Sequence, residues 1–363
     1  MSIGLFSMGG FGPIGARKFL VSARFERFAK SWGDAVKLPR RKYLHLSAGV
    51  GVLAVCCLFL LNIDASSQPG RTVKAVVPFP AGASTDILAR LLGENISKAH
   101  GVTVVVENRP GAGASIGYEA VARAAPDGNT VVFAANSLVI NPILRKVNYD
   151  PKSSFEPICN IVNSPLVLAV NKASPYHTLN DLLDAGRAKP GELSLAGTGP
   201  GAAQHIAIER LKQVAKLNMI YVPFAGGAPA VNALLGGHVT AILQNYGDMS
   251  EQLKSGSIRP LATASRGRIE PLPSVPTIAE SGHRDYEEEV WFGVLAPAKT
   301  PDKSISELSD WFSEAIKIQD IKLKLLNIGL YPAAKCGAEF AAHIRNQDDY
   351  YRRIVRDANI KSE

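Results

Sequence analysis

The chain has 363 residues, of which 46% are hydrophobic and 20% are charged, and it carries 40 Lys and Arg against 32 Asp and Glu. This composition is that of a globular protein of about two domains, and it excludes disordered and fibrous chains. Nine of the basic residues lie before residue 68 beside only three acidic ones, so the rest of the chain carries 31 basic and 29 acidic residues. A body so close to neutral lacks the electrostatic footprint of a nucleic-acid-binding protein.

The N-terminal segment predicts export. A basic stretch that contains Arg40 and Arg41 precedes an apolar, nearly uncharged run at 46–63, and small polar residues follow. These are the three parts of a secretory signal, although a run of this length also reaches the lower limit for a membrane anchor, which stays open. Arg40 and Arg41 resemble a twin-arginine signal. Residues 1–35 are long for the front of a signal, which makes Val36 an alternative start.

The remainder of the chain alternates strand and helix patterns. Short β-branched or apolar runs predict strands, and apolar residues at helical spacing predict helices. The first series has strands at 72–79, 102–108 and 129–136 and helices at 84–101 and 113–125. The second has strands at 166–171, 193–199, 218–224 and 239–245 and helices at 178–188, 202–215 and 227–238. A strand within 289–301 and helices over 302–326 and 339–359 follow. This order predicts an α/β fold whose sheets are mostly parallel and flanked by helices.

One apolar phrase occurs twice, as VPFPAG at 77–82 and as VPFAGG at 222–227. Each copy leads from a predicted strand into a predicted helix, which is where open parallel sheets bind ligands. A helix N-terminus offers unpaired N–H groups and about half a positive charge, so it attracts a carboxylate or phosphate without a Lys or Arg. Gly82, Gly226 and Gly227 would let a ligand approach the backbone closely. If each copy belongs to a different domain, the two loops hold a small anion from both ends.

A third loop of the same character is AGTGPGAAQH at 196–205. It places Gly199 beside Thr198, whose hydroxyl can donate a hydrogen bond. The loop lacks the Lys-Ser/Thr of a phosphate-binding P-loop, and GAGASIG at 111–117 misses the dinucleotide-binding spacing by one residue. Nucleotide cofactors are therefore not expected.

No cluster of reactive side chains stands out at these loops. No G-x-S-x-G motif, paired acids or Cys/His pair is expected at them, Ser84 has no evident base, and the seven His are scattered singly without zinc-type spacing. We therefore expect a binding protein and no enzyme, with no metal and no cofactor. Cys159 and Cys336 fit either one disulfide or two small buried apolar residues, and the second interpretation is favoured.

Several motifs together resemble one family. They include VVPFPAGASTDILARLL, VENRPGAGASIGYEAVARAAPDGNTVVFA, VPFAGGAPAVNALLGGHV, LPSVPTIAESG and WFGVLAPAKTP. These segments resemble the substrate-binding proteins of tripartite tricarboxylate transporters, the Bug-type solute receptors, over residues 71–360. The resemblance implies a monomeric periplasmic binding protein of the two-domain Venus-flytrap type, similar to type II. Such a receptor closes on a small organic acid and delivers it to the subunits of a membrane transporter.

The resemblance also implies which residues meet the ligand. In such receptors the loop after the first strand and its counterpart in the second domain form a carboxylate pincer, often helped by ordered water. The pincer residues carried over to this chain are Phe79, Ala81, Gly82, Ser84, Thr85, Asp86, Gly226, Gly227 and Ala228. Residues at other family positions that line the cleft are Asn136, Ser137, Thr198 and His205.

Each of these side chains also has a structural explanation. Ser84, Thr85 and Asp86 are N-cap residue types, which can satisfy the first amides of a helix. Phe79 can be a core aromatic residue. His205 lies inside a predicted helix, where a single His is more often a structural group than a ligand contact.

The domain layout follows from two strand-like connections, LVLAVN and WFGVLAP. Domain 1 is expected to combine 71–164 with 290–363 and domain 2 to span 165–289, after an N-terminal extension at 1–67. A ligand sensor that presents the bound acid to a signalling partner is the alternative to a transport receptor. The identity of the acid stays open, because main-chain amides and water recognise any carboxylate.

Overall fold

The computed structural model describes residues 70–360, so the predicted extension and signal at 1–67 lie outside the described residues. Within the described range ten strands form one sheet. They are β1 (Thr72–Val77), β2 (Thr103–Asn108), β3 (Thr130–Ala135), β4 (Phe155–Asn171), β5 (Ser194–Thr198), β6 (Ile220–Phe224), β7 (Ala241–Asn245), β8 (Ile258–Thr263), β9 (Glu289–Pro297) and β10 (Tyr331–Cys336).

The long strand β4 joins two groups of parallel strands. The sheet order is β2-β1-β3-β9-β4-β7-β5-β6, and β10 and β8 pair with β4 outside this path. In the first strand group β1 is parallel to β2 and β3, and in the second β5 is parallel to β6 and β7. Residues 155–165 of β4 pair antiparallel with β9, and residues 166–171 pair antiparallel with β7 and β8. The sheet is therefore mixed, and its parallel parts are the two groups on either side of β4 and β9.

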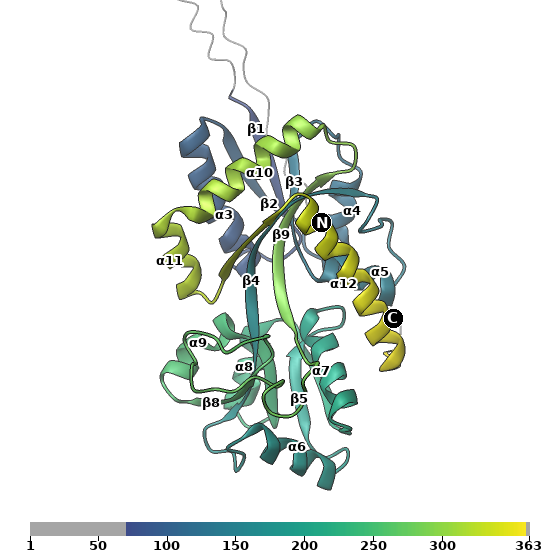
Figure 1. Cartoon of the computed structure of the whole chain (residues 1–363), viewed down its shortest axis with the longest axis vertical. Helices are drawn as coiled ribbons and strands as arrows, with labels where there is room; N and C mark the ends of the chain where they lie inside the picture. The colour runs from purple at the N-terminus through teal and green to yellow at the C-terminus, as the bar shows by residue number, and fades with distance from the viewer. Residues whose placement is uncertain (1–69, 361–363) are drawn as a thin grey trace, which may run out of the picture. The chain divides into compact units, whose positions relative to one another are not determined.

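Helices cover both faces of the sheet. They are the 3-10 helix η1 (Ala112–Ala114) and the α-helices α3 (Ser84–His100), α4 (Ser115–Ala122), α5 (Ser137–Leu144), α6 (Leu179–Ala188), α7 (Ala203–Val214), α8 (Gly227–Leu235), α9 (Tyr246–Lys254), α10 (Asp302–Lys317), α11 (Gln319–Asn327) and α12 (Ala338–Asp357). Around the first strand group, α3, α10 and α11 share one side and α4, α5 and α12 the other (Figure 1). None of the described helices is long and apolar enough to span a membrane.

The core follows the two-residue period of the strands. Along the last part of β4, Leu166, Leu168 and Val170 belong to the cluster that includes α6 and α7. The alternate residues Val167 and Ala169 belong to the cluster that includes α8 and α9. All five are fully buried. Successive side chains of a strand point to opposite faces, so a continuous apolar run is what a strand covered on both faces requires.

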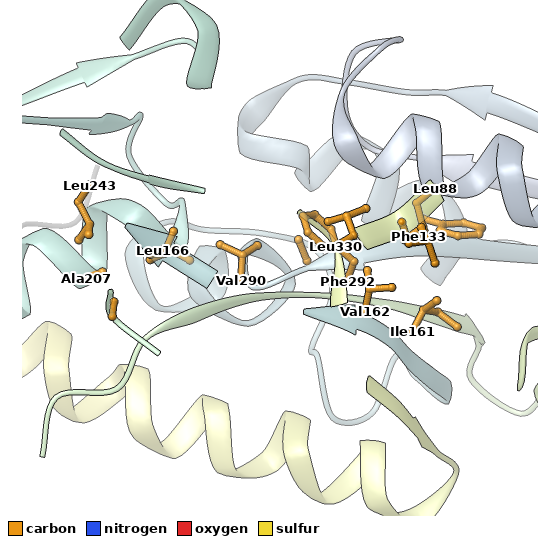
Figure 2. Packing of buried hydrophobic residues seen from close by; sticks show 14 of the residues in the cluster. Leu88, Phe133, Ile161, Val162, Leu166, Ala207, Leu243, Val290, Phe292 and Leu330 are labelled. Atoms are coloured by element: carbon orange, nitrogen blue, oxygen red, sulfur yellow. The ribbon is translucent and has the colours of Figure 1, made fainter. Parts of the chain in front are cut away.

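The apolar core continues through the strands that join the two groups. Figure 2 shows the cluster reaching from Leu88 and Phe133, beside the first strand group, past Phe292 to Leu166 and Leu243. Fully burying one such side chain contributes about 1.5–3 kcal/mol. The connecting strands β4 and β9 are therefore a packed part of the core.

Local signals set the helix boundaries. Thr178 precedes α6, and its side chain accepts a hydrogen bond from the backbone N of Asp181 at 3.1 Å. The carboxylate of Asp181 accepts one from the backbone N of Thr178 at 2.9 Å, which completes a capping box worth about 1 kcal/mol. At the other end of a helix, Gly101 ends α3 in the left-handed conformation.

Some elements differ from the sequence expectation. The helical stretch expected over 302–326 is two helices, because Ile318 has an extended backbone at ψ 125°. The strands β8 and β10 and the helices α5 and α9 were not expected, and β4 begins at Phe155 rather than 166. Most of these additions pair with or pack against β4 or β9, so tertiary contacts decide their conformation.

Cys159 and Cys336 form a disulfide with an S–S distance of 2.01 Å. The expectation of two unpaired buried cysteines is therefore wrong. The two residues are register partners in the antiparallel pair of β4 and β10, although they lie 177 positions apart in the chain. The disulfide ties the C-terminal strand to the central one.

Candidate functional site

The sheet register brings the carboxyl ends of the two strand groups near one another. Ala135, the last residue of β3, pairs with Phe292 of β9, which pairs with Val162 of β4. Asn245, the last residue of β7, pairs with Leu166 of β4. Val162 and Leu166 are separated by about 13 Å of strand. Because β1 and β2 run with β3, and β5 and β6 run with β7, the loops that follow these strands lie toward the same stretch of β4.

The carboxylate of Asp86 holds the loop after β1. Its Oδ2 accepts hydrogen bonds from the backbone N of Gly82 at 2.9 Å and from Arg90 Nε at 3.0 Å. Its Oδ1 accepts one from Asn108 Nδ2 at 2.9 Å, and that same amide donates to the carbonyl of Phe79. Burial raises the pKa of Asp86, but the hydrogen bonds from Arg90, Gly82 and Asn108 outweigh it and hold the pKa below its ordinary value. Asp86 is thus ionised at neutral pH and fixes the loop.

The helix α3 begins without a side-chain cap. Its N-cap residue is Ala83, which offers no side-chain oxygen to the first amides. Ser84 is half-buried, Thr85 is buried, and Ala81 is exposed in the preceding loop. Gly82 has φ +82°, and a Cβ there would meet nothing within 4 Å. The loop before α3 therefore borders open space at Gly82, a position that only glycine occupies without strain.

The second copy of the repeated phrase has the same features. Gly226 is the N-cap of α8, with φ +155° and no side-chain cap bond. A Cβ at Gly226 would again meet nothing within 4 Å. Gly227 is half-buried, and Ala228 is exposed in the first turn. Each copy thus has a glycine beside open space close to an uncapped helix start: Gly82 lies one residue before the N-cap of α3, and Gly226 is itself the N-cap of α8.

The third loop carries a polar network. Thr198 Oγ1 accepts a hydrogen bond from Gln244 Nε2 at 2.9 Å, and Gln244 Oε1 accepts one from Gln204 Nε2 at 2.8 Å. The hydroxyl of Tyr221 donates to the carbonyl of Thr198, and its ring stacks on His205 with centroids 4.5 Å apart. Because Thr198 accepts from Gln244, its own hydroxyl proton can still be donated.

This third loop also contacts both neighbouring regions. The backbone N of Gly199 donates to the carbonyl of Phe224, at the end of β6, at 2.9 Å. A Cβ at Gly201 would lie 2.7 Å from Oδ1 of Asn141 in α5 and 3.3 Å from the guanidinium of Arg145. The loop after β5 therefore touches the helix that follows β3, so residues of the two strand groups meet directly.

Asn136 and Ser137 are buried within a hydrogen-bonded network. Asn136 Nδ2 donates to the hydroxyl of Tyr351 at 2.7 Å, and its Oδ1 accepts from the backbone N of Trp291 at 3.0 Å. The hydroxyls of Ser137 and Tyr118 lie 2.8 Å apart. Asn136 thus ties the end of β3 to β9 and α12, with Trp291 buried beside it. Ligand contact by Asn136 or Ser137 stays a prediction.

Asp248 is a residue that sequence reasoning missed. It lies in the first turn of α9. A Cβ at Gly227 would overlap its carboxylate and would lie 2.8 Å from its Cβ, so Asp248 packs directly against the first residue of α8. Burial raises the pKa of Asp248 to about 6. The distance in sequence between Asp248 and the repeated phrase does not predict this contact, because the contact arises only when α8 and α9 pack together.

The expectation that the loops carry no G-x-S-x-G motif is wrong, because residues 113–117, GASIG, match this spacing of serine hydrolases. Ser115 is buried, and its hydroxyl accepts a hydrogen bond from Asn141 Nδ2 at 3.0 Å. A nucleophilic serine needs a base within hydrogen-bond reach, and an amide is not a suitable base. Asn141 and Ser115 therefore do not form a base–nucleophile pair. Among residues 70–360 no group of His, Cys, Asp and Glu is arranged to hold a metal ion.

The chain also matches known proteins. The family model described as "Tripartite tricarboxylate transporter family receptor" matches residues 88–360. The chain belongs to this family. It is 32% identical to protein BugT of Bordetella pertussis over 321 residues, which cover 87% of this chain and 98% of BugT.

Two solved structures of relatives support the fold. One is R. palustris Rpa4515 with adipate, which is 31% identical, has a TM-score of 0.74 and covers 81% of this chain and 99% of its own. The other is MatC from Rhodopseudomonas palustris with bound malate, which is 27% identical, has a TM-score of 0.70 and covers 79% of this chain and 99% of its own. The predicted family and the α/β fold of a two-domain periplasmic binding protein are confirmed. The family consists of solute receptors for tripartite transporters.

Proposed function

We propose that this protein captures a small organic acid between the loop after β1 and the loop after β6 and delivers it to a tripartite membrane transporter. The observation that carries the proposal is the likeness of the two loops. Gly82 and Gly226 each lie in a copy of the repeated phrase, border open space and precede a helix without a side-chain cap. The relatives with adipate and malate support a carboxylate as the ligand.

Main-chain amides are the proposed carboxylate donors. A hydrogen bond to a charged group contributes about 1.5–3 kcal/mol, and the dipole at a helix N-terminus adds about 0.3–1 kcal/mol. Two such helix ends hold a carboxylate from opposite sides, and the hydroxyl of Thr198 supplies a further donor. Asp86 acts indirectly, because its carboxylate keeps the amide of Gly82 and the carbonyl of Phe79 in place.

The proposed domains are 71–164 with 290–363 and 165–289. Two features support these boundaries. The partners of β4 change between Pro165 and Leu166, and β9 begins at Glu289. β4 and β9 then act as the hinge, and a ligand favours the closed form because both domains contact it only there.

The proposed receptor performs no chemistry and works as an exported monomer. Binding and hinge closure need no nucleophile, and the hydroxyl of the buried Ser115 is hydrogen-bonded to the amide of Asn141, which is not a base. The basic and apolar N-terminal segment supports export by a signal or signal anchor, with Arg40 and Arg41 as the twin-arginine pair. A periplasmic location agrees with the disulfide, because such bonds persist in oxidising compartments.

The test is a thermal-shift screen of the purified protein against small mono-, di- and tricarboxylates, each paired with its neutral amide. A ligand at 100 times its dissociation constant adds about 2.7 kcal/mol to the free energy of unfolding, which raises the Tm by several degrees. We expect acids to shift the Tm and their amides to leave it unchanged. A shift from amides alone would contradict the proposal.

The chain offers a matched control for the loop itself. Gly82→Ala adds a methyl group where the ligand approaches, at a φ of +82° and with nothing of the protein within 4 Å. Gly191→Ala adds the same group at a φ of +79°, also with nothing within 4 Å, in the turn before β5. Both variants carry similar backbone strain. Calorimetry should show about tenfold or greater loss of affinity in Gly82→Ala alone. An equal effect of both variants would mean that strain, not the loop, governs binding.

A further inference from the structure

Asp248 places a negative charge beside one arm of the proposed pincer. Its side chain occupies the space that a side chain at 227 would need, so the carboxylate lies against the first residue of α8. That residue follows Gly226, where an added Cβ would meet nothing within 4 Å. The backbone amides proposed to hold the ligand and the carboxylate of Asp248 therefore belong to adjacent positions.

The carboxylate of Asp248 has no hydrogen-bond or ion-pair partner among residues 70–360. Other acids near the loops are compensated, as Asp86 is by Arg90 and by the amide of Gly82. A carboxylate that is partly withdrawn from water and left without a donor is costly, and a ligand that brings a donor recovers that cost. The site thus presents donors for one group of the ligand and an acceptor for another.

We propose that Asp248 selects a ligand that carries a cationic amino group beside its carboxylate, which makes an amino acid the preferred ligand class. The inference rests on the proposed function, because it assigns the partner of the same carboxylate. The ammonium group would donate to Asp248 while the carboxylate binds the amides of the two helix ends. A ligand that places a second carboxylate at this position meets a like charge, which disfavours it.

The test compares acids that differ only in the amino group. Calorimetry at pH 7.5 would measure aspartate against succinate and glutamate against glutarate, and the thermal-shift screen would extend the comparison to other amino acids and their desamino counterparts. The variant is Asp248→Asn, which keeps the shape of the side chain. Glu251→Gln is the matched control, because Glu251 lies on the same helix, its side chain is 78% exposed, and its carboxylate pairs with Lys254.

For the wild type we expect an amino acid to bind roughly 10- to 100-fold more tightly than its desamino counterpart. This ratio of affinities corresponds to the free energy of one hydrogen bond to a charged group. In Asp248→Asn this preference should disappear and the desamino acid should bind more tightly than before, while Glu251→Gln behaves as the wild type. Equal or tighter wild-type binding of the desamino acids would overturn the inference, and so would an amino preference retained in Asp248→Asn. Failure of every acid to bind would instead refute the proposed function itself.

Discussion

Removal of the disulfide between Cys159 and Cys336 should cost a large part of the stability of this protein. The perturbation is the double variant Cys159→Ala and Cys336→Ala. Alanine is used in place of serine because a serine would bring an unpaired hydroxyl to the fully buried position 159. The cross-link closes a loop over 177 positions. The chain-entropy relation then gives about 5 kcal/mol of stabilisation, and native disulfides measure about 2–5 kcal/mol. In a protein of this size a loss of about 3–5 kcal/mol lowers the Tm by roughly 6–10 °C.

The assay is thermal unfolding followed by circular dichroism, with and without a reductant. Reduction should lower the Tm of the wild type by about as much as the two substitutions lower it. The double variant should not respond to the reductant, which controls for the cysteines at 56 and 57. A double variant with unchanged Tm would refute the reasoning, since it would mean that pairing of β4 and β10 needs no covalent support.

The remaining predictions concern buried charges. Arg210 of α7 pairs with Glu288 at 3.1 Å, so Arg210→Met should destabilise the protein by about 3–5 kcal/mol in urea unfolding, and adding Glu288→Gln should restore much of the loss. If the double variant is no more stable than Arg210→Met, an unpaired Glu288 is not the cause. Asp248 has its pKa raised to about 6 in the folded protein from an ordinary 3.8, so the folded state binds the proton more tightly. Wild-type stability relative to Asp248→Asn should fall as the pH rises from about 4 to 6, reach a deficit of about 1–3 kcal/mol above pH 6, and vanish below pH 4. A pH-independent difference between the two proteins would rule out this titration.

The pattern of the sequence predicts the parallel strands and their helices because the apolar spacing there is long and regular. β3, β5 and β7 are short apolar runs between helices, and a strand covered on both faces shows that pattern. β10 was missed because YPAAKC contains a proline and is only partly buried, so its pairing with β4 decides its conformation. The break at Ile318 also has no Gly or Pro signal.

The candidate site was predictable where it depends on the local backbone. Gly82 and Gly226 stand in loops between strand and helix, and their positive φ angles explain why glycine is present. The contact of Asp248 with Gly227 and the network around Asn136 join segments that only tertiary packing brings together. The same reason applies to the disulfide, because the pairing of β4 with β10 aligns cysteines that lie far apart in the chain.

A crystal structure of the protein with the acid that binds most tightly would test the central claim most directly. We predict carboxylate oxygens within about 2.7–3.2 Å of backbone N atoms at 84–86 and at 226–228, with both loops contacting the same ligand. A carboxylate held by a side-chain cation away from these two loops would contradict the account.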